Sequence, residues 1–533
     1  MEHEIIGRGT WLDKTAMKIL EREDRLGRKV EVFKVESGLG ASGIPHLGSL
    51  GDGARAYGMK LALEAAGRKA TYVAFSDDKD GLRKVPAGLP DSLEKYLGYP
   101  VNEVPDPFEC HDSYGEHMSS LLRDGLDTCG IKYEFVSAAD AYKRGLFNKE
   151  IDAILRNAAK AGQIIQSEVA QEKYVEALPY FAICEDCGRI YTTTAVNYLP
   201  EEKKVVYRCQ GMEVKGTRLR GCGHEGEADI TKGEGKLMWK VEFAMRWSAL
   251  GIHVEAYGKD IADSVRVNDK ISQEILHYPP PFHVRYEMFL DKGGRKISKS
   301  TGNVFTPQVW FRYASPQSLL LLMYKRVVGS RTLSVSDVAT YMREFDDLED
   351  VYFGLRDVSD DRERAKLRGL YEYCWLLNPP SRPSIHVPYN LLVFLARVSP
   401  KGREVQFMVD KLRGYGLPAD ETSRDLLNRI RCAQNWAEDF QEIREMRVEL
   451  SEAERDAIQE LIELIRSESD EQKLQNGIFT VARKHSLKAE SFFKTLYQVL
   501  IGSPEGPRLG PYLIAMGREN VADALSRAIR CED

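Results

Sequence analysis

The chain has 533 residues, of which 75 are lysine or arginine and 81 are aspartate or glutamate, so its formal net charge is −6. At roughly 150 residues per domain, this length predicts about three domains that fold without disulfide bonds. No run of about 18 uncharged apolar residues is present and the first residues carry charges, so we expect a cytoplasmic protein without a membrane partner.

The first predicted elements are a strand, a turn, a helix and a second strand. Residues 30–36 alternate apolar and polar side chains, and the glycine-rich stretch 37–43 follows. Residues 47–66 have helical spacing, and 70–75 form an apolar run typical of a buried strand. This succession predicts a doubly wound parallel sheet, a Rossmann-like α/β fold, in which a glycine-rich turn before a helix binds phosphate groups.

The rest of the chain divides into insertions and a helical half. Residues 101–150 open with Pro105-Asp-Pro107 and indicate an insertion, and 181–228 are rich in cysteine. Beyond Thr306 glycine becomes sparse and helical spacing dominates. The predicted helices are 315–326, 334–353, 430–440, 451–467 and 470–485, with a capping box at Ser451-Glu-Ala-Glu454.

These patterns predict four domains. A catalytic domain takes residues 1–100 and 230–305, and a connective insertion with zinc sites takes 101–229. A linking helical domain covers 306–380, and an all-α carboxyl-terminal domain covers 381–533.

Four cysteines of the insertion have the spacing of metal ligands. Cys184-Glu-Asp-Cys187 forms a knuckle, and Cys209 and Cys222 follow, with His224 as a possible substitute for Cys209. Four soft ligands in this order predict a tetrahedral structural zinc site, although twelve residues between the last two is unusually long. One alternative is a pair of buried thiols, which the polar surroundings disfavour. The other is a redox pair, which would need a thioredoxin-like strand and helix context that is missing here.

A second cluster combines oxygen, sulfur and nitrogen donors. Asp106, Cys110, His111 and His117 suit zinc if a helix begins near Asp112, because His117 then returns over the first turn. The alternative is that both histidines are surface or capping residues.

Two short segments carry the catalytic signal. His46-Leu-Gly48 stands where the first predicted helix begins, and Lys296-Ile-Ser298-Lys299 places two lysines three residues apart. Taken singly, the first is compatible with a histidine that bonds locally and the second with a solvated basic loop. Two ammonium groups on such a loop can also stabilise the charge that develops on a leaving pyrophosphate.

Together, the two segments resemble the HIGH and KMSKS signatures of class I aminoacyl-tRNA synthetases. Within that class the chain is most similar to the class I lysyl-tRNA synthetases, best known from archaea and some bacteria. The resemblance covers residues 30–330, and its supporting stretches are 36–46, 76–84, 106–111, 258–260 and 313–318.

The resemblance implies a two-step reaction with L-lysine, ATP with Mg²⁺ and tRNA(Lys) as partners, and with no DNA. The lysine carboxylate attacks the ATP α-phosphorus to give lysyl-adenylate, and the terminal ribose 2′-hydroxyl of tRNA then attacks the mixed anhydride. Because a carboxylate is already a good nucleophile, the enzyme needs positioning and charge stabilisation rather than a strong base.

The implied catalytic residues are His46 for the ATP phosphates and Lys296 and Lys299 for the pyrophosphate, with Gly48 close to adenosine. The implied ATP-binding set is Gly43, His46, Gly48, Ser49, Lys296, Ser298 and Lys299. The family also implies zinc in the connective region, at two sites here, and an anticodon-binding role for the carboxyl-terminal helices.

The lysine contacts carried over by motif are Gly38, Trp239 and Tyr286. An ammonium pocket needs carboxylates, aromatic faces or neutral acceptors, and further candidates are Glu36, Asp77, Asp78, Asp80 and Trp247. The chain departs from the family at Ile261, where many relatives have histidine, and at Gly40-Ala41. Because the first departure removes a polar partner, either the pocket is rearranged or the substrate is not lysine.

Three other functions are compatible with parts of this pattern. A glutamate-type class I synthetase also has a helical cage, but the first loop and the Asp106–His117 match favour lysine. A paralogue that binds tRNA without charging it would not need both signature lysines. A nucleotidylyltransferase shares the histidine–glycine motif but is usually much smaller.

Overall fold

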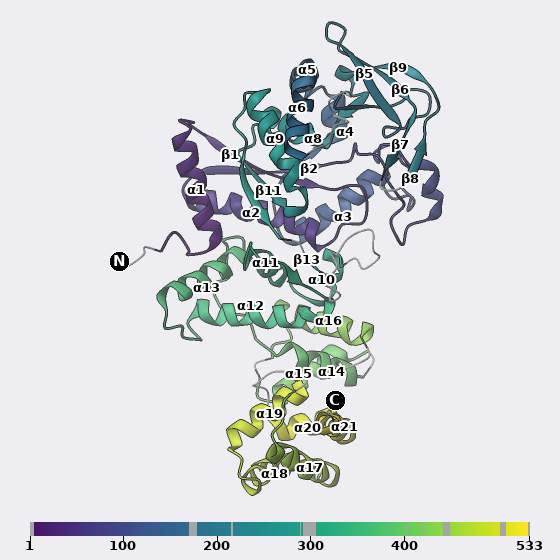
Figure 1. Cartoon of the computed structure of the whole chain (residues 1–533). Coiled ribbons are helices and arrows are strands. Elements are labelled where there is room, and N and C mark those ends of the chain that lie inside the picture. The colour runs from purple at the N-terminus through teal and green to yellow at the C-terminus, as the bar shows by residue number, and fades with distance from the viewer. Residues whose placement is uncertain are drawn as a thin grey trace. The chain divides into compact units, whose positions relative to one another are not determined.

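The computed structural model describes residues 5–169, 178–214, 217–287, 289–290, 305–400, 402–417, 419–440, 448–501 and 508–530 (Figure 1). The chain forms two compact units. The first contains Met1–Gln308, Leu319–Val335 and Asp357–Pro379, and the second contains Val309–Ser318, Ser336–Arg356 and Pro380–Asp533. Among the helices of these described ranges, none is long and apolar enough to span a membrane.

A five-stranded parallel sheet forms the centre of the first unit. Its strands are β1 (Val32–Leu39), β2 (Lys69–Ser76), β3 (Glu134–Ser137), β11 (Val254–Gly258) and β12 (Phe282–Tyr286). Their order is β12-β11-β1-β2-β3, so the chain winds outward from β1 in one direction and later in the other. This confirms the predicted doubly wound sheet. The reversal lies between β1 and β11, and such sheets bind ligands at the carboxyl ends of the strands beside the reversal.

Helices cover both faces of the sheet (Figure 1). The helices nearest to it are α1 (Trp11–Arg25), α2 (Leu47–Ala65), α3 (Tyr114–Thr128), α8 (Trp239–Leu250) and α9 (Ala262–Glu274). Right-handed crossovers in the two winding directions place the β1–β2 helix α2 and the β11–β12 helix α9 on opposite faces. The predicted helix at 47–66 and the predicted strands at 30–36 and 70–75 are therefore confirmed, to within three residues at each end.

The range predicted as an insertion contributes one strand to the central sheet. β3 pairs with β2 in parallel, with Val73 opposite Glu134 and Ser76 opposite Ser137. This strand has only four residues and no fully buried side chain, so its sequence carries too little alternation to be recognised. The insertion proper begins after β3, with helices α4 (Ala138–Lys143), α5 (Asn148–Arg156) and α6 (Ala158–Val169).

A small antiparallel module carries the cysteines. Strands β5 (Thr193–Leu199), β6 (Lys204–Cys209) and β9 (Glu225–Asp229) form its sheet, and β7 (Gly211–Val214) with β8 (Thr217–Arg220) forms a hairpin. β4 (Tyr180–Ala182) pairs with β10 (Gly235–Leu237) and leads back to α8. One apolar cluster joins Tyr207 of this module to Ile151 of α5, Val241 of α8 and Phe75 of β2. The module is therefore packed onto the central sheet by a shared core.

The remaining elements of the first unit are short, apart from α13 (Asp361–Cys374). They are the 3₁₀ turns η1 (Asp91–Tyr96), η2 (Ile230–Lys232) and η3 (Lys259–Ile261), and the paired strands β13 (Phe289–Leu290) and β14 (Arg331–Thr332). The elements α10 (Pro307–Tyr313), α11 (Pro316–Tyr324) and η4 (Val335–Asp337) each have residues in both units.

The described part of the second unit is helical. Its helices are α12 (Val338–Phe353), α14 (Tyr389–Val398), α15 (Glu404–Gly414), α16 (Arg424–Asp439), α17 (Glu452–Ser467), α18 (Glu471–Lys484), α19 (Ala489–Ile501), α20 (Leu509–Met516) and α21 (Arg518–Arg530). The predicted helical half is thus confirmed. So is the capping box, because the Ser451 side chain accepts from the Glu454 N–H and the Glu454 side chain accepts from the Ser451 N–H.

A charged cluster in the second unit ties α12 to the segment before α14. His386 Nε2 lies 2.8 Å from Glu349 Oε2, and its Nδ1 lies 3.1 Å from an oxygen of Asp350. Burial lowers the pKa of His386, but the bond to Glu349 and the charge of Asp346 outweigh it, and the pKa is raised above its usual value. The protonated imidazole therefore stabilises this unit.

We expect His386→Gln to lower the free energy of unfolding by about 1–3 kcal/mol at pH 6. Because the folded pKa is raised, the contribution is fully present below the unfolded pKa and is lost as pH rises through the folded pKa. The difference between variant and wild type should therefore shrink at pH 9. Urea unfolding followed by circular dichroism at both pH values measures it, and equal destabilisation at pH 6 and pH 9 would contradict a charged imidazole.

Candidate active site

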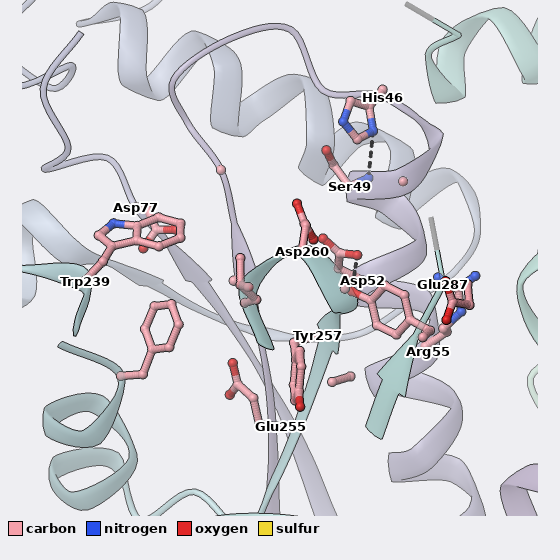
Figure 2. A pocket seen from close by; sticks show the side chains of 18 of the residues that line it. His46, Ser49, Asp52, Arg55, Asp77, Trp239, Glu255, Tyr257, Asp260 and Glu287 are labelled. Carbon is pink, nitrogen blue, oxygen red and sulfur yellow. Dashed lines mark hydrogen bonds between the residues drawn. The ribbon is translucent and has the colours of Figure 1, made fainter. Parts of the chain in front are cut away.

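A pocket opens at the carboxyl ends of β1, β11 and β12, beside the point where the sheet reverses its winding (Figure 2). The loop after β1, the start of α2, the start of α8 and the turn after β11 form its walls. Its predicted site residues are Gly38, His46, Gly48, Ser49, Trp239 and Tyr286, and it is also lined by Gly40, Asp52, Arg55, Asp77, Phe243, Arg246, Glu255, Ala256, Tyr257, Gly258, Asp260, Ile261, Glu287 and Phe289. Gly43 lies in the turn before α2 and is not one of the lining residues.

His46 caps the helix that faces the pocket. Its Nδ1 accepts a hydrogen bond from the Ser49 N–H at 3.2 Å, so in a neutral imidazole the proton is on Nε2. The ring lies over Gly48, where a Cβ would stand 2.7 Å from His46 Cε1. The hydrogen bond to Ser49 is thus compatible with the predicted role of His46 at the ATP phosphates, because the amino-terminal end of α2 still faces the pocket.

The second signature, with Lys296, Ser298 and Lys299, lies outside the described residues. The chain on both sides of it is placed at the pocket. Phe289 lines the pocket before the segment, and after it the Phe305 carbonyl accepts a hydrogen bond from the Leu47 N–H at 2.9 Å. Leu47 follows His46 directly, so of the described residues nearest to the second signature, Phe289 lies at the pocket and Phe305 lies beside the first signature.

A buried arginine organises the carboxylates beneath the pocket. Arg246 Nε lies 2.9 Å from Glu36, and its two terminal nitrogens lie 3.3 Å from Asp77 and 3.5 Å from Glu255. Burial raises the pKa of Asp77 to about 7 against the opposing charge of Arg246, and it raises the pKa of Glu36 and of Glu255 as well. Burial thus disfavours the ionised form of all three carboxyl groups, and the charge of Arg246 favours it.

A second buried cation, Lys236, orients the pocket tryptophan. Its Nζ lies 2.5 Å from Asp80 and 2.9 Å from Glu242. The same Asp80 accepts a hydrogen bond from the Trp239 indole at 3.2 Å, which fixes the ring in the pocket wall. Trp247, the other candidate tryptophan, is fully buried in the core and bonds to Glu255.

The deep end of the pocket is formed by Tyr286, Asp52 and Arg55. The Tyr286 hydroxyl donates to Asp52, and burial together with the Asp52 charge raises the pKa of Tyr286 well above its usual value, so the phenol stays protonated. The Arg55 guanidinium lies 4.3 Å from the centre of the Tyr286 ring. Sequence reasoning missed Asp52 and Arg55, although polar residues at three-residue intervals from Ser49 on a buried helix were an available signal.

Ile261, one of the positions where the chain departs from the sequence pattern that it resembles, gives the pocket an apolar wall. It lines the pocket and packs in the apolar cluster that includes Trp239 and Tyr257. The pocket is therefore arranged around aromatic packing on this side.

Comparison with known proteins identifies the family of the chain. Residues 9–375 match the family described as tRNA synthetases class I (K). The chain belongs to this family. It is 50% identical to a lysine–tRNA ligase of Cenarchaeum symbiosum (strain A), over 97% of this chain and 98% of that one. It is 30% identical to one of Natronomonas pharaonis over 97% of both chains, and 29% identical to one of Rickettsia bellii (strain OSU 85-389) over 95% of both.

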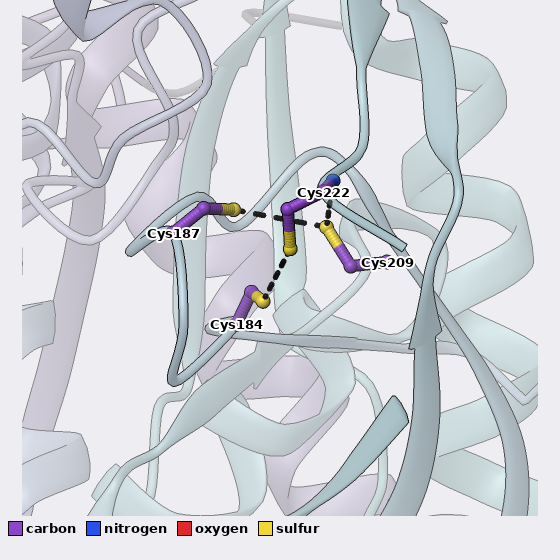
Figure 3. A group of neighbouring side chains, drawn as sticks. All are labelled: Cys184, Cys187, Cys209 and Cys222. Carbon is purple, nitrogen blue, oxygen red and sulfur yellow. Dashed lines mark hydrogen bonds between the residues drawn. The ribbon is translucent and has the colours of Figure 1, made fainter. Parts of the chain in front are cut away.

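The synthetase brings its four predicted cysteine ligands together (Figure 3). Cys184 Sγ lies 3.6 Å from Cys222 Sγ, and Cys187 Sγ lies 3.7 Å from Cys209 Sγ. A tetrahedral zinc site with Zn–S bonds of about 2.3 Å has sulfur atoms roughly 3.8 Å apart. The four thiols therefore fit one zinc ion. His224 is not part of this group, because its Nε2 bonds to Glu185 at 2.7 Å.

The long interval between Cys209 and Cys222 is filled by the β7–β8 hairpin. Gly211 pairs with Arg220 at its base, and the Gly223 N–H donates to the Cys209 carbonyl at 2.9 Å. A Cβ on Gly221 would stand 2.1 Å from that carbonyl, so only glycine permits this close approach. The hairpin thus leaves the two cysteines as neighbours despite their separation in sequence.

The second predicted cluster also assembles in the synthetase. His117 Nδ1 lies 3.2 Å from Cys110 Sγ and 3.2 Å from Asp106 Oδ2, and His111 Nδ1 lies 3.2 Å from Cys110 Sγ. α3 begins at Tyr114, which places His117 on its first turn, as predicted. Backbone hydrogen bonds from Phe108 and Cys110 overcome the effect of burial and lower the pKa of Asp106 to about 2, so a carboxylate is available as a ligand.

Proposed function

We propose that this synthetase is a lysine–tRNA ligase that activates L-lysine with ATP and transfers it to the 3′-terminal adenosine of tRNA(Lys). The observation that carries the proposal is a pocket with a phosphate-binding helix start at its mouth and a tyrosine-bound carboxylate at its deep end. Relatives named lysine–tRNA ligase, aligned over nearly the whole chain, support the same activity.

The pocket suits an extended lysine. Asp52 lies six positions after His46, a distance of about 9 Å along the axis of α2, which is close to the reach of lysine from carboxylate to ammonium. We place the ammonium group on Asp52 and Tyr286, with Gly38 and Trp239 along the side chain. A glutamate substrate would instead need a cation at the deep end, and there Arg55 is covered by the ring of Tyr286.

Activation needs positioned groups rather than a base. With Nδ1 held by Ser49, the Nε2–H of His46 and the start of α2 face the ATP phosphates, and Gly48 keeps the approach open. Lys296 and Lys299 of the second signature would stabilise the departing pyrophosphate. Mg²⁺ enters with ATP and neutralises phosphate charge.

We further propose zinc at both metal clusters, as structural ions held by Cys184, Cys187, Cys209 and Cys222 and by Asp106, Cys110, His111 and His117. The helical domain over 381–533 would bind the anticodon and 306–380 the tRNA stem, in the cytoplasm, where tRNA is charged.

Amino-acid-dependent ATP–pyrophosphate exchange tests the proposal. We expect exchange with lysine alone among the twenty amino acids, because the deep end of the pocket offers a carboxylate and a phenol to an ammonium group. The assay is run with and without tRNA. Exchange with a different amino acid would assign another specificity, and no exchange under either condition would favour a paralogue that does not charge tRNA.

A further inference from the structure

A second cavity of about 750 Å³ lies beside the active site, between the carboxyl ends of β2 and β3 and the cysteine module. The turn after β2 separates the two, since Asp77 lines the first pocket while Asp78 and Lys79 line the second. Its volume falls within the range of small-molecule sites, about 300–1,000 Å³. The reaction proposed above does not use this cavity.

Lys79 is the unusual residue of the cavity. The residue is only 4% exposed, and among the described residues no side chain lies within hydrogen-bond or ion-pair distance of its ammonium group. Its Nζ lies 5.8 Å from the centre of the Tyr142 ring. Burial lowers the pKa of Lys79 to about 8, although the charge of Glu103 opposes the shift. Lys79 is thus mostly buried and lines the cavity, so an anionic group there would offset the cost of holding its charge away from bulk water.

The walls around Lys79 are acidic. Glu103, Asp112, Glu116 and Asp140 line the cavity, whereas Lys143 and Lys232 are its other cations. This excess of negative charge disfavours a polyanion such as RNA. It favours a small ligand that combines one carboxylate with one or more ammonium groups, so that each charge meets its opposite.

We propose that this cavity binds a free basic amino acid, whose carboxylate meets Lys79 and whose ammonium groups meet the acidic wall. The choice of lysine as the ligand rests on the proposed function, because lysine is the basic amino acid that this enzyme would meet as substrate. The site would then hold a second lysine next to the one being activated, across the β2 turn.

Equilibrium dialysis of the full-length enzyme at pH 7 tests this site. The active site is first saturated with a non-hydrolysable lysyl-adenylate analogue, lysyl-sulfamoyladenosine, and radiolabelled L-lysine is then added. We expect one further equivalent of lysine to bind the wild type. K79M should weaken this binding at least tenfold, K79R should retain it, and K149M, which removes an exposed lysine that does not line the cavity, should leave it unchanged.

The absence of residual lysine binding in the saturated wild type would overturn the second site, as would equal binding by K79M. Circular dichroism and analogue binding show that each variant is folded. Failure of the analogue to bind, or exchange with another amino acid, would instead count against the proposed function, so the two failures are distinguishable. L-glutamate, whose net charge is negative, should not compete.

Discussion

Asp52→Asn should raise the KM for lysine by roughly 30- to 1,000-fold while leaving the KM for ATP within about threefold of the wild type. The substitution keeps the shape of the side chain but removes the charge that faces the ammonium group, and losing one partner of a buried charged pair costs about 2–4 kcal/mol. Lysine-dependent pyrophosphate exchange at varied lysine and varied ATP measures both constants.

A second carboxylate of the pocket provides a matched control for Asp52→Asn. Glu287→Gln makes the same change at another lining carboxylate, but Glu287 is already bound by Lys259. We expect a much smaller rise in the KM for lysine from that variant. Tyr286→Phe removes a neutral hydroxyl that donates to Asp52 and should cost about 1 kcal/mol, or about fivefold in the KM for lysine. A rise in the KM for ATP equal to that for lysine would show that Asp52 supports the fold of α2 instead.

Local patterns predicted the elements that carry the first signature. The strand at Val32–Leu39, the helix at Leu47–Ala65 and the strand at Lys69–Ser76 have strong periodicity, because each buries one face or both in the same core. Both metal clusters were also predictable, since soft ligands at short intervals mark them regardless of the surrounding fold.

The charge network beneath the pocket could not be predicted in this way. Arg246 meets Glu36 from β1, Asp77 from the end of β2 and Glu255 from β11, and only the order of strands in the sheet brings these segments together. For the same reason the roles of Asp52 and Arg55 depend on Tyr286, which lies more than two hundred residues later. The four-residue strand β3 is defined by its pairing with β2 and not by its own sequence.

The cysteine module has one feature of each kind. Its four candidate zinc ligands are predictable from their spacing, whereas its packing against the helix that carries Trp239 is not. Its core is continuous with α8, the helix that begins at Trp239 in the active-site wall. The zinc ion proposed for the four thiols would tie the Cys184–Cys187 knuckle to the end of β6 and to the base of the hairpin. A metal site far from the chemistry would thereby fix one wall of the amino-acid pocket.

Cys209→Ser is therefore expected to remove one equivalent of zinc and to destabilise the module by several kcal/mol, with loss of pyrophosphate exchange at 37 °C. Cys209 lies where β6 ends, and its backbone bonds to Gly223 and His224, so losing its thiolate releases Cys222 and the hairpin base together. Zinc per chain, thermal unfolding and exchange are measured on the same preparation.

Two other cysteines provide controls. Cys129→Ser changes a buried thiol outside both clusters and should keep all metal, whereas Cys110→Ser should lose the other equivalent and leave the module folded. Unchanged zinc content in Cys209→Ser would show that Cys209 is not a zinc ligand. Full exchange activity without that zinc would show that the module does not determine the position of the pocket wall.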